Sequence, residues 1–140
     1  MRKVSIEIAK AFINDKKKTV GNTYTEDGKI FLHNNKIAWW EKNHPDSNLS
    51  NNIHLCFSMC GWDTPTTRER LNTLFCELFN GDLIYLKQSE GNQYLYINST
   101  VYCMEIDPSK VYILREIGGD VFLDEPVNQI VEYFTRNLAY

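Results

Sequence analysis

Apolar side chains recur every three or four positions in three segments, which is the spacing of one face of a helix. The N-terminal segment spans residues 4–14 and has Ser5 or a nearby residue as its expected cap; its apolar stripe is Val4, Ile8, Ala11 and Phe12. The central stripe is Leu71, Leu74, Phe75 and Leu78. The third stripe follows Asp124-Glu125-Pro126 and consists of Val127, Ile130, Val131, Phe134 and Leu138. The pattern predicts about three helices: N-terminal, central and C-terminal.

Short β-prone segments separated by turn residues lie between these helices. The predicted strands before the central helix are residues 19–25, 29–33, 36–41 and 53–60, with turns at Asp27-Gly28 and Asn34-Asn35. Those after it are 83–87, 93–97, 100–106 and 110–116. Runs of strands joined by tight turns predict an α+β fold with one or more antiparallel sheets.

The strand predicted over residues 53–60 has a strictly alternating pattern, which assigns its side chains to two faces. The face expected in the core carries Ile53, Leu55, Phe57 and Met59. The opposite face carries His54, Cys56, Ser58 and Cys60.

Length and charge limit the classes of protein that the chain can belong to. At 140 residues we expect a single domain, 1–140, with a flexible polar loop over 43–52 and a helix stop at Asn80-Gly81. A net charge of −3 is too balanced for a general nucleic-acid or membrane surface. No apolar run reaches the roughly 18 residues that span a bilayer. The four cysteines lack the spacing of a disulfide framework, so we expect the protein in a reducing cytoplasm.

The most informative segment is residues 60–72, called here the Trp62 block, which joins an apolar strand to the central helix. The helix start has two registers. Thr64 is the N-cap if Pro65 takes the first helical position. Thr66 is the N-cap if Glu69, three residues later, completes a capping box. The sequence leaves both registers open.

The same block has two interpretations. As a binding site, Arg68 and Asn72 share one helix face, Arg70 points elsewhere, and Trp62 offers a stacking surface for a phosphate, nucleotide or carboxylate ligand. The candidate ligand- or partner-binding residues are Trp62, Thr64, Thr66, Thr67, Arg68, Arg70 and Asn72. As a structural element, Trp62 fills the core, the threonines cap the helix, and the arginines pair with Glu69 or Glu77.

Three stretches of sequence carry a resemblance to a known group of proteins. They are AF at 11–12 with VGNT at 20–23, LHNNKIA at 32–38, and GWDTPTTRERLN at 61–72. Together they resemble small proteins encoded widely in bacteriophage genomes, over roughly residues 9–74. The chain departs from that pattern at Asn34, where a glycine is common, and in its longer C-terminal half. The resemblance implies phage origin, and with it the cytoplasm of a bacterial host cell as the location; it carries over no catalytic residues.

Other chemical sites have little support in the sequence. The chain has no Cys-x-x-Cys, His-x-x-x-His, P-loop or dinucleotide fingerprint, so we expect no metal, no cofactor and no catalytic residues. Cys56 and Cys60 share a strand face but lie about 13 Å apart along an extended chain. His33, His44 or His54 could meet a cysteine only through the fold, and structural cysteines are commoner than nucleophilic ones.

Three hypotheses follow, from different classes. The first is a non-enzymatic phage protein that binds and inhibits a host protein, for instance a CRISPR-type defence nuclease or its nucleic-acid complex, as anti-CRISPR proteins do. The second is a nucleotide- or nucleic-acid-binding module that uses the Trp62 block. The third is a small enzyme. No membrane partner is expected, and self-association is left open.

Overall fold

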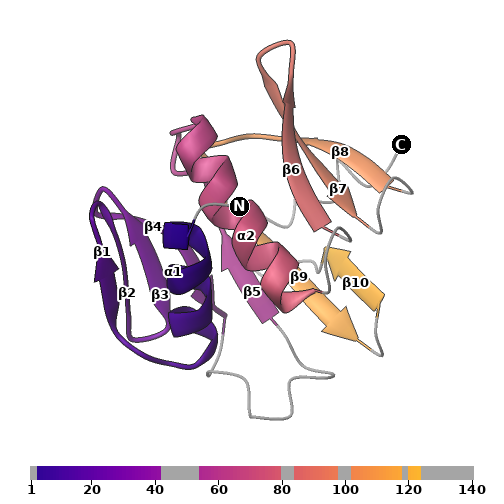
Figure 1. Ribbon diagram of the computed structural model, residues 1–140. Coiled ribbons are helices and arrows are strands. Elements are labelled where there is room, and N and C mark those ends of the chain that lie inside the picture. Colours follow the sequence, from indigo (N-terminus) through magenta and orange to yellow (C-terminus); the bar gives the residue numbers. More distant parts are fainter. Residues whose placement is uncertain (1–2, 42–53, 80–83, 98–101, 118–119, 124–140) are drawn as a thin grey trace.

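The computed structural model describes residues 3–41, 54–79, 84–97, 102–117 and 120–123. These residues form two helices, α1 (Lys3–Ile13) and α2 (Pro65–Leu78) (Figure 1). The strands before α2 are β1 (Lys18–Val20), β2 (Thr23–Glu26), β3 (Lys29–Leu32), β4 (Asn35–Trp40) and β5 (His54–Phe57). Those after it are β6 (Ile84–Ser89), β7 (Asn92–Ile97), β8 (Tyr102–Ile106), β9 (Tyr112–Ile117) and β10 (Asp120–Leu123).

The strands form two antiparallel sheets. The larger has the order β1-β2-β3-β4-β5-β9-β10, and the smaller has the order β6-β7-β8. Helix α1 packs on β1, β2 and β3, whereas α2 contacts α1, β4 and β6 and so lies between the two sheets (Figure 1). The Trp62 block therefore lies where the two sheets approach each other.

The predicted α+β class with antiparallel sheets is confirmed, although strands dominate and the described residues contain two helices rather than about three. The N-terminal and central helices form as predicted. The predicted C-terminal helix, the loop over 43–52 and the helix stop at Asn80-Gly81 lie outside the described residues.

Two turns differ from the sequence prediction. Residues 19–25 form two strands rather than one, because the chain reverses at Gly21, whose φ of +61° suits glycine. The Asp27-Gly28 hairpin turn is confirmed. The next turn is at His33-Asn34, one residue earlier than predicted, and both residues have positive φ.

The strand β5 is buried on both faces, because Leu55 and Phe57 lie in the core as predicted and Cys56 on the opposite face is buried as well. It lies in the middle of the large sheet, between β4 and β9. Cys56 stands directly opposite Trp39 on one side and Ile113 on the other, and both partners lie on its own face. Alternation along one strand does not show how bulky the residues on neighbouring strands are.

Aromatic side chains join α2 to the sheet. Phe57 of β5 makes an edge-to-face contact with Phe75 of α2 at 5.1 Å between ring centroids. Its ring also stacks on Tyr112 of β9 at 5.7 Å. On the other side of the core, Phe12 of α1 stacks on Trp40 at 4.4 Å. These contacts fix α2, and with it the Trp62 block, relative to the large sheet.

Candidate functional site

The helix α2 begins with Thr64 as its N-cap. The Thr64 hydroxyl accepts a hydrogen bond from the Thr67 backbone amide at 3.2 Å, and Pro65 is the first helical residue. The alternative register, with Thr66 as the cap and Glu69 completing a capping box, is wrong. The Glu69 carboxylate instead contacts Ser5 and Arg70, because tertiary partners compete with the local cap.

We expect Thr64→Ala to lower the free energy of unfolding by about 1 kcal/mol, because the mutation removes the cap of α2. Thr66→Ala is the matched control and should change stability by less than about 0.5 kcal/mol. Urea denaturation of both variants measures the difference. An equal loss in the two variants would contradict Thr64 as the cap.

The turn before Trp62 is tight and is held by one hydrogen bond of its own and by two hydrogen bonds to other segments. Cys60 and Gly61 both have positive φ, +54° and +79°, and the Trp62 amide donates to the Met59 carbonyl at 2.8 Å, as in a type I′ turn. The Gly61 amide donates to the Pro108 carbonyl at 2.9 Å, and the Cys60 thiol donates to the Lys36 carbonyl at 3.0 Å. The position of the Trp62 backbone is thus set by hydrogen bonds from this turn to the carbonyls of two other segments.

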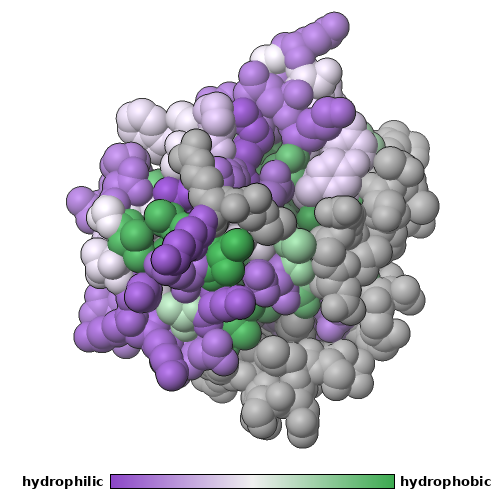
Figure 2. All heavy atoms as spheres, viewed as in Figure 1, coloured by the Kyte–Doolittle hydropathy of each residue, from purple (hydrophilic) through white to green (hydrophobic). Residues whose placement is uncertain are grey.

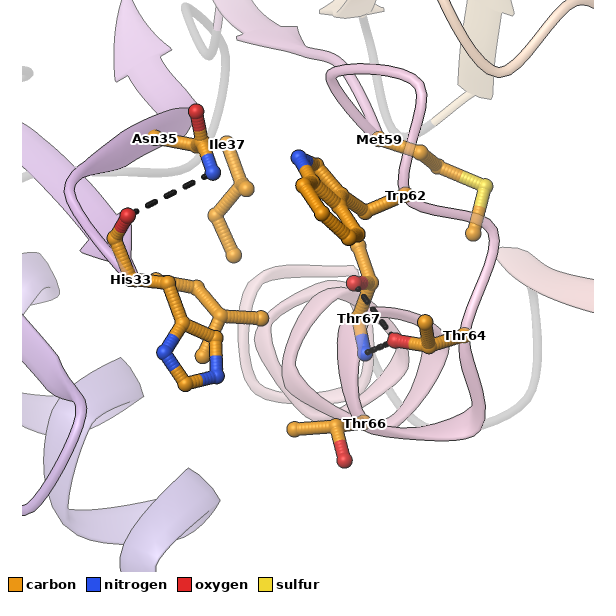
Figure 3. A pocket seen from close by; sticks show the side chains of 9 residues that line it. His33, Asn35, Ile37, Met59, Trp62, Thr64, Thr66 and Thr67 are labelled. Carbon is orange, nitrogen blue, oxygen red and sulfur yellow. Dashed lines mark hydrogen bonds between the residues drawn. The ribbon is translucent and has the colours of Figure 1, made fainter.

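Trp62 is the one large hydrophobic side chain that is well exposed among the described residues, with 60% of its surface accessible. It borders a cavity of about 260 Å³. Thr64, Thr66 and Thr67 lie on its side of this cavity, and His33 and Asn35 lie on the other (Figure 3). Leu32, Ile37 and Met59 supply the apolar lining, and among the residues that the structure describes no lysine, arginine, aspartate or glutamate lines the cavity.

Arg68 and Asn72 share one face of α2, as predicted, but that face packs against the small sheet. One guanidinium nitrogen of Arg68, Nη1, donates to the Asp63 carbonyl and to the side-chain oxygens of Gln88 and Gln93 at 2.9–3.2 Å. The Asn72 amide group pairs with both the backbone N–H and the carbonyl of Leu86 in β6. Both polar groups are therefore engaged within the chain and do not line the cavity beside Trp62.

Arg70 points the opposite way, into the contact between α1, α2 and β2. Its residue surface is only 8% exposed. The guanidinium donates to the hydroxyls of Thr23 and Ser5, at 3.1 and 2.8 Å, and to the Glu69 carboxylate at 3.1 Å. The sequence predicted Ser5 as a possible cap of α1. The structure instead places Ser5 inside α1, as a buried member of this network. The structure thus brings together Trp62 and the three threonines and separates them from Arg68, Arg70 and Asn72.

The remaining candidate side chains are dispersed. Burial raises the pKa of the Cys56 thiol to about 12 and also raises the pKa of Cys60, so neither is activated as a thiolate. His54 lies between Glu41 and Arg115, and its two ring nitrogens contact those side chains. No group of three or more metal-ligating side chains among the described residues is placed to hold an ion. His44 lies outside the described residues.

The sequence analysis did not identify His33 and Asn35 as part of the cavity. Nothing local distinguishes them, since they lie in a β-turn and at the start of β4, about thirty positions before Trp62. A usable signal was present in the resemblance. Two of its three parts were the stretches 32–38 and 61–72. They meet at this cavity, where the first stretch supplies Leu32, His33, Asn35 and Ile37.

The comparisons with known proteins identify a family. The model of the Kyanoviridae Gp96 protein family matches residues 1–107, which run from α1 through the end of β8. No curated protein and no solved structure matches the chain. In the described residues, no helix is long and apolar enough to cross a membrane. The chain belongs to the Kyanoviridae Gp96 protein family, a family of phage proteins.

Proposed function

We propose that this chain is a phage protein that acts by binding a host protein, with Trp62 as the anchor of the contact. The observation that carries the proposal is the exposed indole of Trp62 beside a cavity whose described lining residues carry no lysine, arginine, aspartate or glutamate. Tryptophan is among the residues most enriched at energetic centres of protein interfaces. The braced turn before it reduces the entropy lost on binding, because the side chain is already presented on a fixed backbone.

The contacts of Arg68 and Asn72 favour a protein partner over a nucleotide. A phosphate ligand would need the guanidinium of Arg68, which is already hydrogen-bonded to three neutral acceptors. It would also need positive charge in the cavity, where none of the described lysines or arginines lies. A neutral, partly apolar cavity beside a tryptophan suits an uncharged side chain of a protein.

Trp62→Ala tests the proposal. Tagged wild-type protein and the variant are expressed in the host, and captured host proteins are quantified by mass spectrometry. We expect the host partner to be depleted at least tenfold with Trp62→Ala, since truncating such an anchor costs about 2 kcal/mol or more. The control Lys18→Ala, an exposed change on β1, should retain the partner. Melting temperatures within about 2 °C of wild type confirm that both variants fold. Equal capture by all three proteins, or capture of no host protein, would contradict the proposal.

The specific form of this proposal is inhibition of a host defence nuclease of the CRISPR type. Its support is membership in a phage protein family. The corresponding assay measures cleavage of target DNA by the host nuclease with and without the purified protein. Undiminished cleavage would contradict inhibition of a defence nuclease. The broader proposal, that the protein binds a host protein, would still be tested by Trp62→Ala.

A further inference from the structure

The cavity beside Trp62 reaches from the surface down to the core. Leu32, Ile37 and Met59 line it, and these residues are only 4%, 2% and 1% exposed, so they belong to the packed interior. All three side chains are apolar. A group that enters from the surface therefore meets apolar atoms at the inner end of the cavity.

Two rings border the cavity on opposite sides, the indole of Trp62 and the imidazole of His33 (Figure 3). Both residues are exposed, and each belongs to a turn that hydrogen bonds hold in place. The His33 amide donates to the Asn22 carbonyl at 2.9 Å, and the Trp62 amide donates to the Met59 carbonyl at 2.8 Å. The His33 ring also lies 3.1 Å from the side-chain amide of Asn22. The space between the two rings is therefore formed in the free protein, which reduces the entropy lost on binding.

The size of the cavity suits a single ring. Its volume is about 260 Å³, whereas an apolar cavity of about 150 Å³ is enough to hold benzene. It therefore has room for a six-membered ring and for the methylene group that joins such a ring to a backbone. Aromatic rings favour offset or edge-to-face contact with one another, and the indole of Trp62 offers that contact. An aliphatic side chain would fill the same space without it.

The chemistry of the lining favours a ring without polar atoms. Because the described lining residues carry no charge, a charged group would lose its hydration there without a counter-charge. A nucleobase edge or a tyrosine hydroxyl would meet the three apolar core residues at the inner end, where it also lacks a compensating hydrogen bond from them. The hydroxyls of Thr64 and Thr67 are hydrogen-bonded to each other at 3.0 Å. Phenylalanine fits because its side chain has no polar atom to desolvate.

The apolar area that a partner can contact is concentrated at this cavity. Among the described residues, Trp62 is the large hydrophobic side chain that is well exposed. On the face that Figure 2 shows, hydrophobic residues form only small patches among hydrophilic ones, and the tip of the β6–β7 hairpin is hydrophilic. A ring inserted beside an exposed tryptophan has the character of an energetic centre of a protein interface.

We propose that the cavity beside Trp62 receives a phenylalanine side chain of the host protein; this inference rests on the function proposed above. The phenylalanine ring lies between the indole of Trp62 and the imidazole of His33, with its edge against the three apolar core residues. The contact surface of the partner is then recognised by an exposed phenylalanine.

The test uses the full chain and capped glycine pentapeptides with phenylalanine, tyrosine, leucine or glutamate at the central position. Adenosine is the probe for a nucleobase. Binding is followed by NMR chemical shifts of the labelled protein. We expect saturable shifts at the Trp62 indole, His33 and Thr66 with the phenylalanine peptide, and affinities at least threefold lower for the tyrosine and leucine peptides. The glutamate peptide and adenosine should give no saturable shifts.

Thr66→Phe fills the cavity with a ring of the protein's own, because Thr66 is a half-buried lining residue in the first turn of α2. We expect this variant to bind the phenylalanine peptide at least fivefold more weakly than wild type. The control Thr19→Phe makes the same substitution at an exposed position of β1 and should leave the affinity unchanged. Melting temperatures show whether both variants fold, and the peptide series on the wild-type protein tests the proposal in either case.

The outcomes separate this inference from the proposed function. If adenosine or the leucine peptide binds as tightly as the phenylalanine peptide, or if folded Thr66→Phe binds that peptide like wild type, the assignment of the cavity is overturned. If Thr66→Phe still captures the host protein that Trp62→Ala loses, the cavity is not the partner's site although Trp62 is its anchor. If wild type captures no host protein, the proposed function fails, while the peptide series still decides which side chain the cavity binds.

Discussion

Replacing Phe57 with alanine is expected to lower the free energy of unfolding by about 4 kcal/mol, a large part of the stability of a typical domain. The ring is fully buried and contacts Phe75 of α2 and Tyr112 of β9. The mutation therefore leaves a cavity where α2 and two central strands of the large sheet meet. Chemical denaturation followed by tryptophan fluorescence measures the loss.

The size of the effect at Phe57 can be checked with a smaller truncation. Phe57→Leu keeps most of the buried volume and should cost roughly 1–1.5 kcal/mol. Phe31→Ala is a positional control, because Phe31 is a half-buried aromatic that stacks on Tyr24 near the sheet edge, at 4.7 Å. If Phe31→Ala destabilises the protein as much as Phe57→Ala, the contact with α2 is not the centre of the core.

The second large effect is expected at Arg70. We expect Arg70→Ala to lower the free energy of unfolding by about 3 kcal/mol, because it leaves the buried hydroxyls of Ser5 and Thr23 and the Glu69 carboxylate without their shared donor. The measurement is the denaturation midpoint in urea at pH 7, converted with the slope of the transition.

Arg68→Ala is the matched control, since it removes the same side chain two positions away on α2. Its guanidinium is less buried and bonds only neutral acceptors, so the expected loss is about 1 kcal/mol. Glu69→Gln keeps a hydrogen-bond acceptor near Arg70 and should cost less than Arg70→Ala. A larger loss at Arg68 than at Arg70 would refute the assignment of Arg70 as the central donor.

Local sequence predicted local structure well. Side chains that act on their immediate neighbours determine the Asp27-Gly28 hairpin and the position of α2. They also determine the N-cap at Thr64, which was one of the two predicted registers. The helical period also placed Arg68 and Asn72 on a face apart from Arg70, which is where the structure has them. These predictions succeed because their physical causes lie within a few residues.

The sequence could not predict what each face of α2 contacts. Periodicity cannot show that β6 packs against the face of Arg68 and Asn72, or that Ser5 meets Arg70 across 65 positions. The cavity beside Trp62 depends on the turn at His33. Each site is assembled by tertiary contacts, so its residues could be named only in part from the Trp62 block.

The pairing of β5 with β9 bears on how the protein is made. His54 stands opposite Arg115, so the small sheet and α2 are synthesised before β5 has its second neighbour. Until then the strand that carries Leu55 and Phe57 offers an open, apolar edge to any other extended chain. Synthesis of residues 112–117, beyond the part matched by the family model, closes that edge. The nascent chain is therefore most exposed to aggregation in the interval between the synthesis of β5 and that of β9.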